Sequence, residues 1–341
     1  MTRDQPFGAD HGSGDIGPTL RVLSLGAGKQ STALLLLSAQ GILPRLDAAI
    51  FADTGWEPGV VYEHLERIER EIARPAGIPI YRVSSGNIRA DALDPAHRFA
   101  SMPLYVLNQD GTPGMTRRQC TSEYKLKPIK RQVRDLLGYP HPTRVPDGVY
   151  VEQWIGISTD ERDRAIDKDT GELKTGDVRY SRNRYPLLDL GLSRDACTIA
   201  LTRAGFAATP KSACTGCPFH TNAQWRDLRD NHPTEFADAV AFDTAIRGGA
   251  ARANADGNPL LGQAYLHRSR LPLGQAPIDR VTFREWATRQ GDLLHELALA
   301  EFEESLPAEA TEQLGGCSPF ACHGAAVTDP EEAQSTLVVA P

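Results

Sequence analysis

Short apolar runs alternate with longer amphipathic segments through the first half of the chain. Runs of this length are typical of buried strands, whereas the segments between them carry apolar residues at helical spacing. The predicted strands cover residues 21–25, 48–52, 78–83 and 150–157, and the predicted helices cover residues 31–40, 58–73 and 127–137. Because strands joined by helices form βαβ crossovers, we expect an α/β fold with a parallel sheet and helices on both faces.

The two ends and the second half of the chain differ from this pattern. Residues 1–18 are rich in Gly, Asp and Pro, and from Arg194 onward the pattern is helical and rich in turns. Residues 248–264 are typical of a surface loop. We therefore expect a disordered tail over residues 1–18, an α/β domain over 19–193, a helical cysteine-bearing region over 194–305 and a flexible tail over 306–341.

The net charge argues against a protein that coats nucleic acid along its whole surface, and the hydropathy argues against a membrane-spanning protein. The chain has 341 residues and a net charge of -7. Because it is negative overall, it could bind a polynucleotide only through a locally basic stretch. Such a stretch runs from Arg117 to Arg134, although a solvated helix face has the same composition. No apolar run approaches the roughly 20 residues that span a bilayer, and the first residues have no apolar signal segment. We expect a cytoplasmic protein with no membrane partner.

A glycine loop follows the first predicted strand, over residues 24–32. Its small residues Gly26, Ala27 and Gly28 allow a phosphate to approach the backbone, and the following helix offers free N–H groups. Lys29 adds a positive charge, and hydroxyl donors follow it. The loop is not a Walker A motif, because Gln30 interrupts it, and it lacks the third glycine of the dinucleotide fingerprint. An ordinary tight turn would also have this composition.

Two further segments follow later strands. Asp53-Thr54-Gly55 ends the second strand, where an acid can accept a hydrogen bond from a ribose hydroxyl or an adenine amine. Gly156 to Arg164 follows the strand over residues 150–157 and contains Glu161. Because the carboxyl ends of parallel strands share one edge of a sheet, we expect all three segments to lie together.

Together these segments resemble the PP-loop ATP-pyrophosphatase superfamily, most closely its phosphoadenosine phosphosulfate reductase-like branch. The family loop Ser-Gly-Gly-Lys-Asp-Ser stands here as residues 26–31, its Asp-Thr-Gly as residues 53–55, and its Gly-x-Arg-x-x-Glu segment is approximated by residues 156–164. The chain departs at Gln30, which replaces an acid, and at Gly26, which replaces a serine.

That resemblance covers roughly residues 20–230 and implies a PP-loop, HUP-like fold. It implies that the chain binds Mg²⁺ with ATP or phosphoadenylyl sulfate. The residues expected to contact the nucleotide are Ser24, Gly26, Ala27, Gly28, Lys29, Gln30, Ser31, Thr32, Asp53, Thr54, Gly156, Glu161 and Arg164.

Six cysteines indicate metal or redox chemistry, because disulfides are disfavoured in a reducing compartment. Cys214 and Cys217 form a Cys-x-x-Cys turn that can grip zinc or one edge of an iron–sulfur cluster. Cys120 precedes a basic helix in a stretch similar to that of the ATP-pyrophosphatases of DNA phosphorothioation. The resemblance implies a [4Fe–4S] cluster on these three cysteines, with Cys197 as the candidate fourth ligand. Core packing explains Cys197 equally well.

The remaining cysteines, Cys317 and Cys322, lie in the C-terminal tail. They are candidates for a swinging thiol pair, for the fourth cluster ligand, or for an exposed oxidisable pair. Zinc is the competing metal, held by Cys214, Cys217 and either His220 or His323. Nearby, Phe219 and Trp225 are expected to shield the centre, and His267 and Arg268 are weaker candidates for anion binding, since surface charge explains them more simply.

Three functions fit these residues. The first is ATP cleavage to AMP and pyrophosphate, which activates a nucleic acid or nucleotide for sulfur transfer. Lys29, Cys317 and Cys322 are its candidate catalytic residues, tRNA or DNA its polyanionic partner along Arg117 to Arg134, and a cysteine desulfurase its sulfur source. The second is a thioredoxin-linked reductase of phosphoadenylyl or adenylyl sulfate, which releases sulfite. The third is a nucleotide-binding redox sensor without catalysis.

Overall fold

The computed structural model describes residues 17–98, 102–283, 285–286 and 289–290. The described residues up to Val281 form one compact unit, and a second unit begins at Thr282. The tail residues Cys317 and Cys322, which we expected to be catalytic, lie outside the described residues, as does His323.

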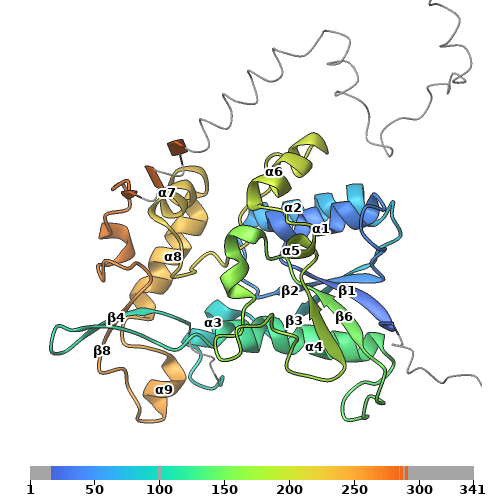
Figure 1. Cartoon of the computed structure of the whole chain (residues 1–341). Coiled ribbons are helices and arrows are strands. Elements are labelled where there is room, and N and C mark those ends of the chain that lie inside the picture. The colour runs from blue at the N-terminus through green and yellow to red at the C-terminus, as the bar shows by residue number, and fades with distance from the viewer. Residues whose placement is uncertain (1–16, 99–101, 284, 287–288, 291–341) are drawn as a thin grey trace, which may run out of the picture. The chain divides into compact units, whose positions relative to one another are not determined.

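Five parallel strands form the main sheet of the first unit, in the order β3-β2-β1-β6-β7 (Figure 1). Leu25 pairs with Phe51, Asp53 with Ser84, and Leu23 with Trp154. The carboxyl ends of these strands therefore share one edge, and the predicted parallel α/β sheet is confirmed. The strands are β1 (Leu20–Leu25), β2 (Ala48–Asp53), β3 (Ile80–Ser84), β6 (Val151–Trp154) and β7 (Ser181–Arg184).

Helices cover both faces of this sheet (Figure 1). On one face α1 (Lys29–Ala39) and α2 (Gly59–Ile68), which continues as η1 (Glu69–Ala73), share an apolar core with α6 (Arg194–Arg203). Residues Ser31 to Ser38 of α1 are all buried, because α6 packs against the side that the sheet leaves open. On the other face α4 (Lys127–Leu136) buries Val133 against the sheet.

A second apolar core lies beside the first, in the same unit. It is built from a three-stranded antiparallel sheet in the order β5-β4-β8 and from two helices that bury Trp225 and Phe242. Trp56, from the loop after β2, joins this core. The elements are β4 (Tyr105–Asn108), β5 (Pro113–Met115), β8 (Gly262–Tyr265), α3 (Ile88–Leu93), α7 (Asn222–Asn231) and α8 (Pro233–Ala245).

The two cores interleave along the sequence. The helix α6 follows residue 193, where we expected the α/β domain to end, yet it packs on α1. Met102 and Leu104 precede that position and belong to the second core. Residues 248–264, which we expected to be a loop, contain α9 and most of β8, so that expectation is wrong in part. The short elements are η2 (Thr121–Leu126), η3 (Thr159–Arg164), α5 (Pro186–Asp189), α9 (Ala251–Ala255) and η4 (Leu273–Gln275).

Within the part of the chain that the structure describes, every helix is too short or too polar to cross a membrane.

Candidate functional site

The glycine loop joins β1 to α1 through a left-handed residue. Ala27 is fully buried and has a φ of 56°, which is unusual for a residue with a side chain. Gly28 precedes α1 in an extended conformation, and no side chain caps the helix there. A left-handed residue directly before a helix N-terminus gathers backbone N–H groups into a concavity that suits an anion.

Hydroxyl groups stabilise this loop from within. The Ser31 Oγ accepts from the Gly26 N–H at 3.2 Å and donates to the Gly28 carbonyl at 3.1 Å. The Thr32 hydroxyl lies 3.2 Å from His64 Nε2 in the buried core, and the Thr32 N–H donates to the Gly28 carbonyl. We expected Thr32 to contact the nucleotide, but its two donors are turned inward and hold the loop.

Two other chain segments meet the glycine loop. A Cβ on Gly156 would lie 3.0 Å from the backbone nitrogen of Ser31, so only glycine allows the segment after β6 to approach α1 this closely. A Cβ on Gly28 would lie 3.6 Å from Ser212, which stands two residues before Cys214. The glycine loop, the segment after β6 and the approach to the cysteine turn therefore converge.

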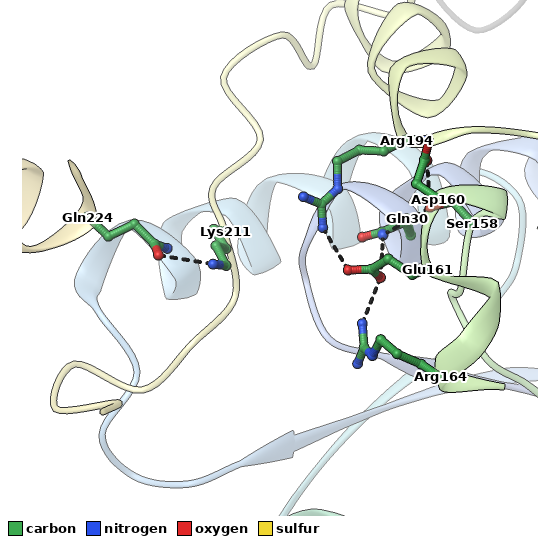
Figure 2. Close-up of polar contacts among 8 residues, drawn as sticks. All are labelled: Gln30, Ser158, Asp160, Glu161, Arg164, Arg194, Lys211 and Gln224. Atoms are coloured by element: carbon green, nitrogen blue, oxygen red, sulfur yellow. Dashed lines mark hydrogen bonds and ion pairs between the residues drawn. The ribbon is translucent and has the colours of Figure 1, made fainter. Parts of the chain in front are cut away.

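Gln30 bonds to the segment after β6 (Figure 2). Its amide donates to Glu161 Oε2 at 3.0 Å and, at 3.4 Å, to Ser158 Oγ. Arg164 lies 2.6 Å from the same carboxylate oxygen and Arg194 lies 3.1 Å from the other. Figure 2 shows the two arginines on either side of Glu161. In the family loop an acid stands at position 30. Here Glu161 supplies a carboxylate next to Gln30 instead.

Arg194 is a further residue of this site, which no motif in the sequence indicates, because it comes from a distant segment. It is the first residue of α6, and its backbone N–H donates to Asp160 Oδ2 at 2.5 Å. This hydrogen bond is the main reason why the pKa of Asp160 lies below its usual value. The contact therefore ties α6 to the segment that carries Glu161.

The acid at the end of β2 has a fixed orientation. Asp53 Oδ1 accepts from the Gly55 N–H at 2.7 Å and from the Tyr62 hydroxyl at 2.8 Å. Burial, followed by the bond to Asp53, raises the pKa of Tyr62 well above its usual value, so Tyr62 stays a donor. Behind the loop, Ser24 accepts from the Gln153 amide at 2.8 Å and so joins β1 to β6.

A buried polar cluster lies next to this edge of the sheet. The Thr54 hydroxyl donates to Glu57 Oε1 at 3.0 Å and lies 3.2 Å from Cys214 Sγ. Lys125 Nζ lies 3.5 Å from the same Glu57 oxygen, and Glu57 Oε2 is buried with no partner among the described residues. Burial of Lys125 acts to lower its pKa, but Glu57, Cys214 and Cys217 together raise it above its usual value. Lys125 is therefore an ammonium beside the thiols.

The cysteine turn is packed on Trp56. A Cβ on Gly216 would lie 2.0 Å from the Trp56 ring, and the Thr215 N–H donates to the Trp56 carbonyl at 2.8 Å. His220 lies with Nε2 3.0 Å from the Cys214 carbonyl, and burial lowers the pKa of His220 to about 4. Nε2 is therefore bonded to the backbone of the turn, whereas Nδ1 is buried without a partner among the described residues.

Three of the predicted metal-binding cysteines share one neighbourhood. Burial raises the pKa of Cys217, and Cys120 raises it further, whereas Lys125 and Arg118 oppose both. Burial, followed by Glu57, raises the pKa of Cys214 far above its usual value. Two cations beside these thiols would offset the negative charge of their thiolate forms. No three Cys, His, Asp or Glu residues within the described ranges already stand in a metal-binding arrangement.

Cys197, the candidate fourth ligand, lies elsewhere. It is buried in α6 within the core that α1 and the sheet share. Burial raises the pKa of Cys197 to about 11, and the charges that act on it are those of Asp160 and Arg194. The structure brings Cys120, Cys214 and Cys217 together and places Cys197 in the apolar core instead.

The segment between α6 and the cysteine turn is also tied to α7. Lys211 Nζ donates to Gln224 Oε1 at 3.0 Å (Figure 2). Gln224 in turn forms a capping box with Thr221 at the start of α7. The segment that passes over Gly28 is therefore attached at a point three residues before Cys214.

Comparison of the chain with protein-family models, with curated proteins and with solved structures finds no match. The resemblance to PP-loop enzymes therefore rests on the motifs in the sequence.

Proposed function

We propose that the chain is a PP-loop enzyme that cleaves ATP to AMP and pyrophosphate and so activates an acceptor for sulfur transfer. The observation that carries this proposal is the meeting of the glycine loop and the cysteine turn. Ser212 lies against Gly28, and Thr54 lies 3.2 Å from Cys214. A nucleotide on the loop and a thiolate-held centre would then face the same acceptor.

The N–H groups at the start of α1 would bind the phosphates in this proposal. Lys29, the first residue of α1, would balance charge that develops on the departing pyrophosphate, with Mg²⁺ on the same phosphates. Arg164 and Arg194 are half exposed next to Glu161 and can turn toward an anion at the loop. Asp53, fixed by Tyr62, would accept from the ribose or the adenine.

Cys120, Cys214 and Cys217 would hold the metal centre. Lys125 and Arg118 would offset the negative charge of their thiolates, and Thr54 can donate to Cys214. When bound, an iron–sulfur cluster would supply a soft metal site that can carry sulfur to the activated acceptor. Zinc on the same thiols would be structural, and iron content with the visible spectrum of the anaerobically purified protein separates the two metals.

Product analysis tests the proposed reaction. The intact protein is incubated with ATP, Mg²⁺, sulfide and a mixture of nucleic acids, and the adenylates are separated. We expect AMP and pyrophosphate in equal amounts, and a rate about a hundredfold lower for Lys29→Ala. The exposed Lys168→Ala variant is the matched control. Release of ADP and phosphate would contradict the proposal.

Different assays identify the two other functions. Sulfite release from phosphoadenylyl sulfate with thioredoxin would identify the reductase, for which Cys317 and Cys322 remain the candidate thiols. Nucleotide binding without turnover, with a reductant and a sulfur donor present, would identify the sensor.

A further inference from the structure

The turn after β8 presents two arginines on a rigid support. His267 is buried, with Nδ1 2.8 Å from the Ser269 hydroxyl and Nε2 3.1 Å from Asn222 Oδ1. Arg270 has a φ of 56°, a left-handed conformation that is costly for a long side chain. Outliers of this kind persist where the surroundings impose them, often at binding sites. Arg268, between them, is exposed.

Contacts join this turn to β4 and to the start of α7, which lies five residues after Cys217 in the sequence. The Arg270 guanidinium lies 5.8 Å from the ring centre of Tyr105. The Arg268 guanidinium donates to Asn222 Oδ1 at 3.2 Å. Asn222 begins α7 and follows Phe219 by three residues in the sequence.

An exposed aromatic ring stands two residues after Cys217 in the sequence. Phe219 is 43% exposed, although it directly follows Cys217-Pro218. The Arg118 guanidinium lies 5.2 Å from the centre of the Phe219 ring, and Arg118 precedes Cys120 by two residues. An apolar ring and a guanidinium plane are thus held together beside two of the three clustered cysteines.

Carboxylates neutralise the lysines of the basic stretch from Arg117 to Arg134, which also contains four arginines. Its three lysines all face carboxylates: Lys125 faces Glu57, while Lys127 and Lys130 lie 2.5 Å from Glu123 and Asp177. The charge that this stretch can offer to a polyanion is therefore smaller than its composition indicates.

We propose that Phe219, Arg118, Arg268 and Arg270, the arginine–phenylalanine surface, bind a single-stranded polynucleotide with one base stacked on Phe219. The proposal rests on the function proposed above, for which it names the acceptor. Aromatic rings stack on any unpaired base, and arginines next to them contact the phosphates. A base inside a duplex is stacked on its neighbours and cannot reach Phe219. The stacked nucleotide would lie next to Cys217.

Fluorescent oligonucleotides test this surface on the full chain. Single strands of DNA and RNA carrying 2-aminopurine, and the matching duplexes, are titrated in several salt concentrations. We expect the single strands to bind more tightly, with 2-aminopurine quenched by stacking. Phe219→Leu should weaken binding about tenfold and abolish the quenching. The double variant R268A/R270A should weaken binding and reduce the salt slope by about 1.4.

Controls separate this surface from the proposed reaction. Arg74→Ala removes an exposed positive charge at the end of η1 and should leave binding unchanged. Calorimetry should show unchanged ATP affinity for Phe219→Leu and for R268A/R270A, and circular dichroism should show intact folds.

Several results would overturn the proposal. Equal affinity for duplexes, or single-strand affinity that is unchanged in both variants, would rule out polynucleotide binding at this surface. Neither result would contradict the proposed ATP cleavage. Binding that depends on Phe219 in a protein that never cleaves ATP keeps the surface and removes the proposed reaction. Binding to DNA strands but not RNA, or the reverse, identifies which polynucleotide is the acceptor.

Discussion

The Thr54 hydroxyl lies 3.2 Å from the sulfur of Cys214, across 160 residues of sequence. Thr54 follows β2, so this contact attaches the cysteine turn to the carboxyl edge of the sheet. The Thr215 N–H and the Trp56 carbonyl form a second attachment at 2.8 Å. The position of the thiols is therefore set by the loop that directly follows Asp53.

Gly216→Ala should break this attachment. The added methyl group would lie 2.0 Å from the Trp56 ring, which is itself buried, so the turn or the ring must move. We expect a loss of about 1–3 kcal/mol in the free energy of unfolding, measured by urea denaturation, together with lower metal content. Gly17→Ala is the control, since nothing lies within 4 Å of its added methyl. A fully stable, fully metallated Gly216→Ala protein would contradict the packing described here.

Metal content should separate the cysteines into two groups. Alanine at Cys120, Cys214 or Cys217 removes a proposed ligand, so each variant should lose most of its bound iron or zinc. Cys197→Ala should keep its metal and lose about 1 kcal/mol of stability, because Cys197 is packed in the α6 core. Elemental analysis and denaturation of the four proteins measure both effects. Metal loss in Cys197→Ala with unchanged stability would place Cys197 in the centre after all.

Gln30→Glu should destabilise the glycine loop. The Gln30 amide donates to Glu161 at 3.0 Å, and a glutamate there would place two carboxylates against each other. We expect a loss of about 1–2 kcal/mol at pH 8. The repulsion raises the pKa of the carboxyl pair in the folded protein, so the loss should shrink as the pH falls and one carboxyl takes a proton. Gln30→Leu removes the hydrogen bond without adding charge, and its loss of stability should be the same at pH 8 and pH 7.

Three buried histidines should make the protein sensitive to mild acid. Burial lowers the pKa of His64, His220 and His267 to about 4, whereas unfolded histidine titrates near 6.5. Between these values the unfolded chain binds more protons than the folded one, so the free energy of unfolding falls as the pH falls. Each histidine contributes about 1.4 kcal/mol per pH unit well inside that range.

Denaturation of wild type and His64→Gln at pH 7, 6 and 5 measures this slope. The slope for the variant should be smaller by the contribution of one histidine. Thr32 keeps a hydrogen-bonding partner in this variant. An unchanged slope would mean that His64 is protonated in the folded protein.

The sequence predicted the parallel sheet because its central strands are continuous apolar runs. Ala48–Asp53 is buried along nearly its whole length, so its signal is strong. The strand Ser181–Arg184 reads Ser-Arg-Asn-Arg and was missed, because an edge strand does not need an apolar sequence. Pro113–Met115 was missed for a similar reason, since proline and glycine are typical of turns.

Some residues of the candidate site could be predicted from the sequence, and others could not. The glycine loop and Asp53 were found because each is a local motif after a strand. Glu57, Lys125 and Cys214 come from three distant segments, and only the folded chain places them together. No spacing rule relates them, so their cluster was beyond sequence reasoning. For Cys197, the sequence left two alternatives open, a fourth cluster ligand or a residue packed in the core.

Ser212 lies against Gly28 and stands two residues before Cys214. If the thiols hold a metal as proposed, a ligand on the loop that shifts Ser212 would change the free energy of metal binding through the one residue that joins Ser212 to Cys214. Thermodynamic linkage then requires that metal change the affinity for that ligand by the same factor. If bound metal makes the ligand bind twofold more tightly, bound ligand makes the metal bind twofold more tightly, whichever of the two binds first.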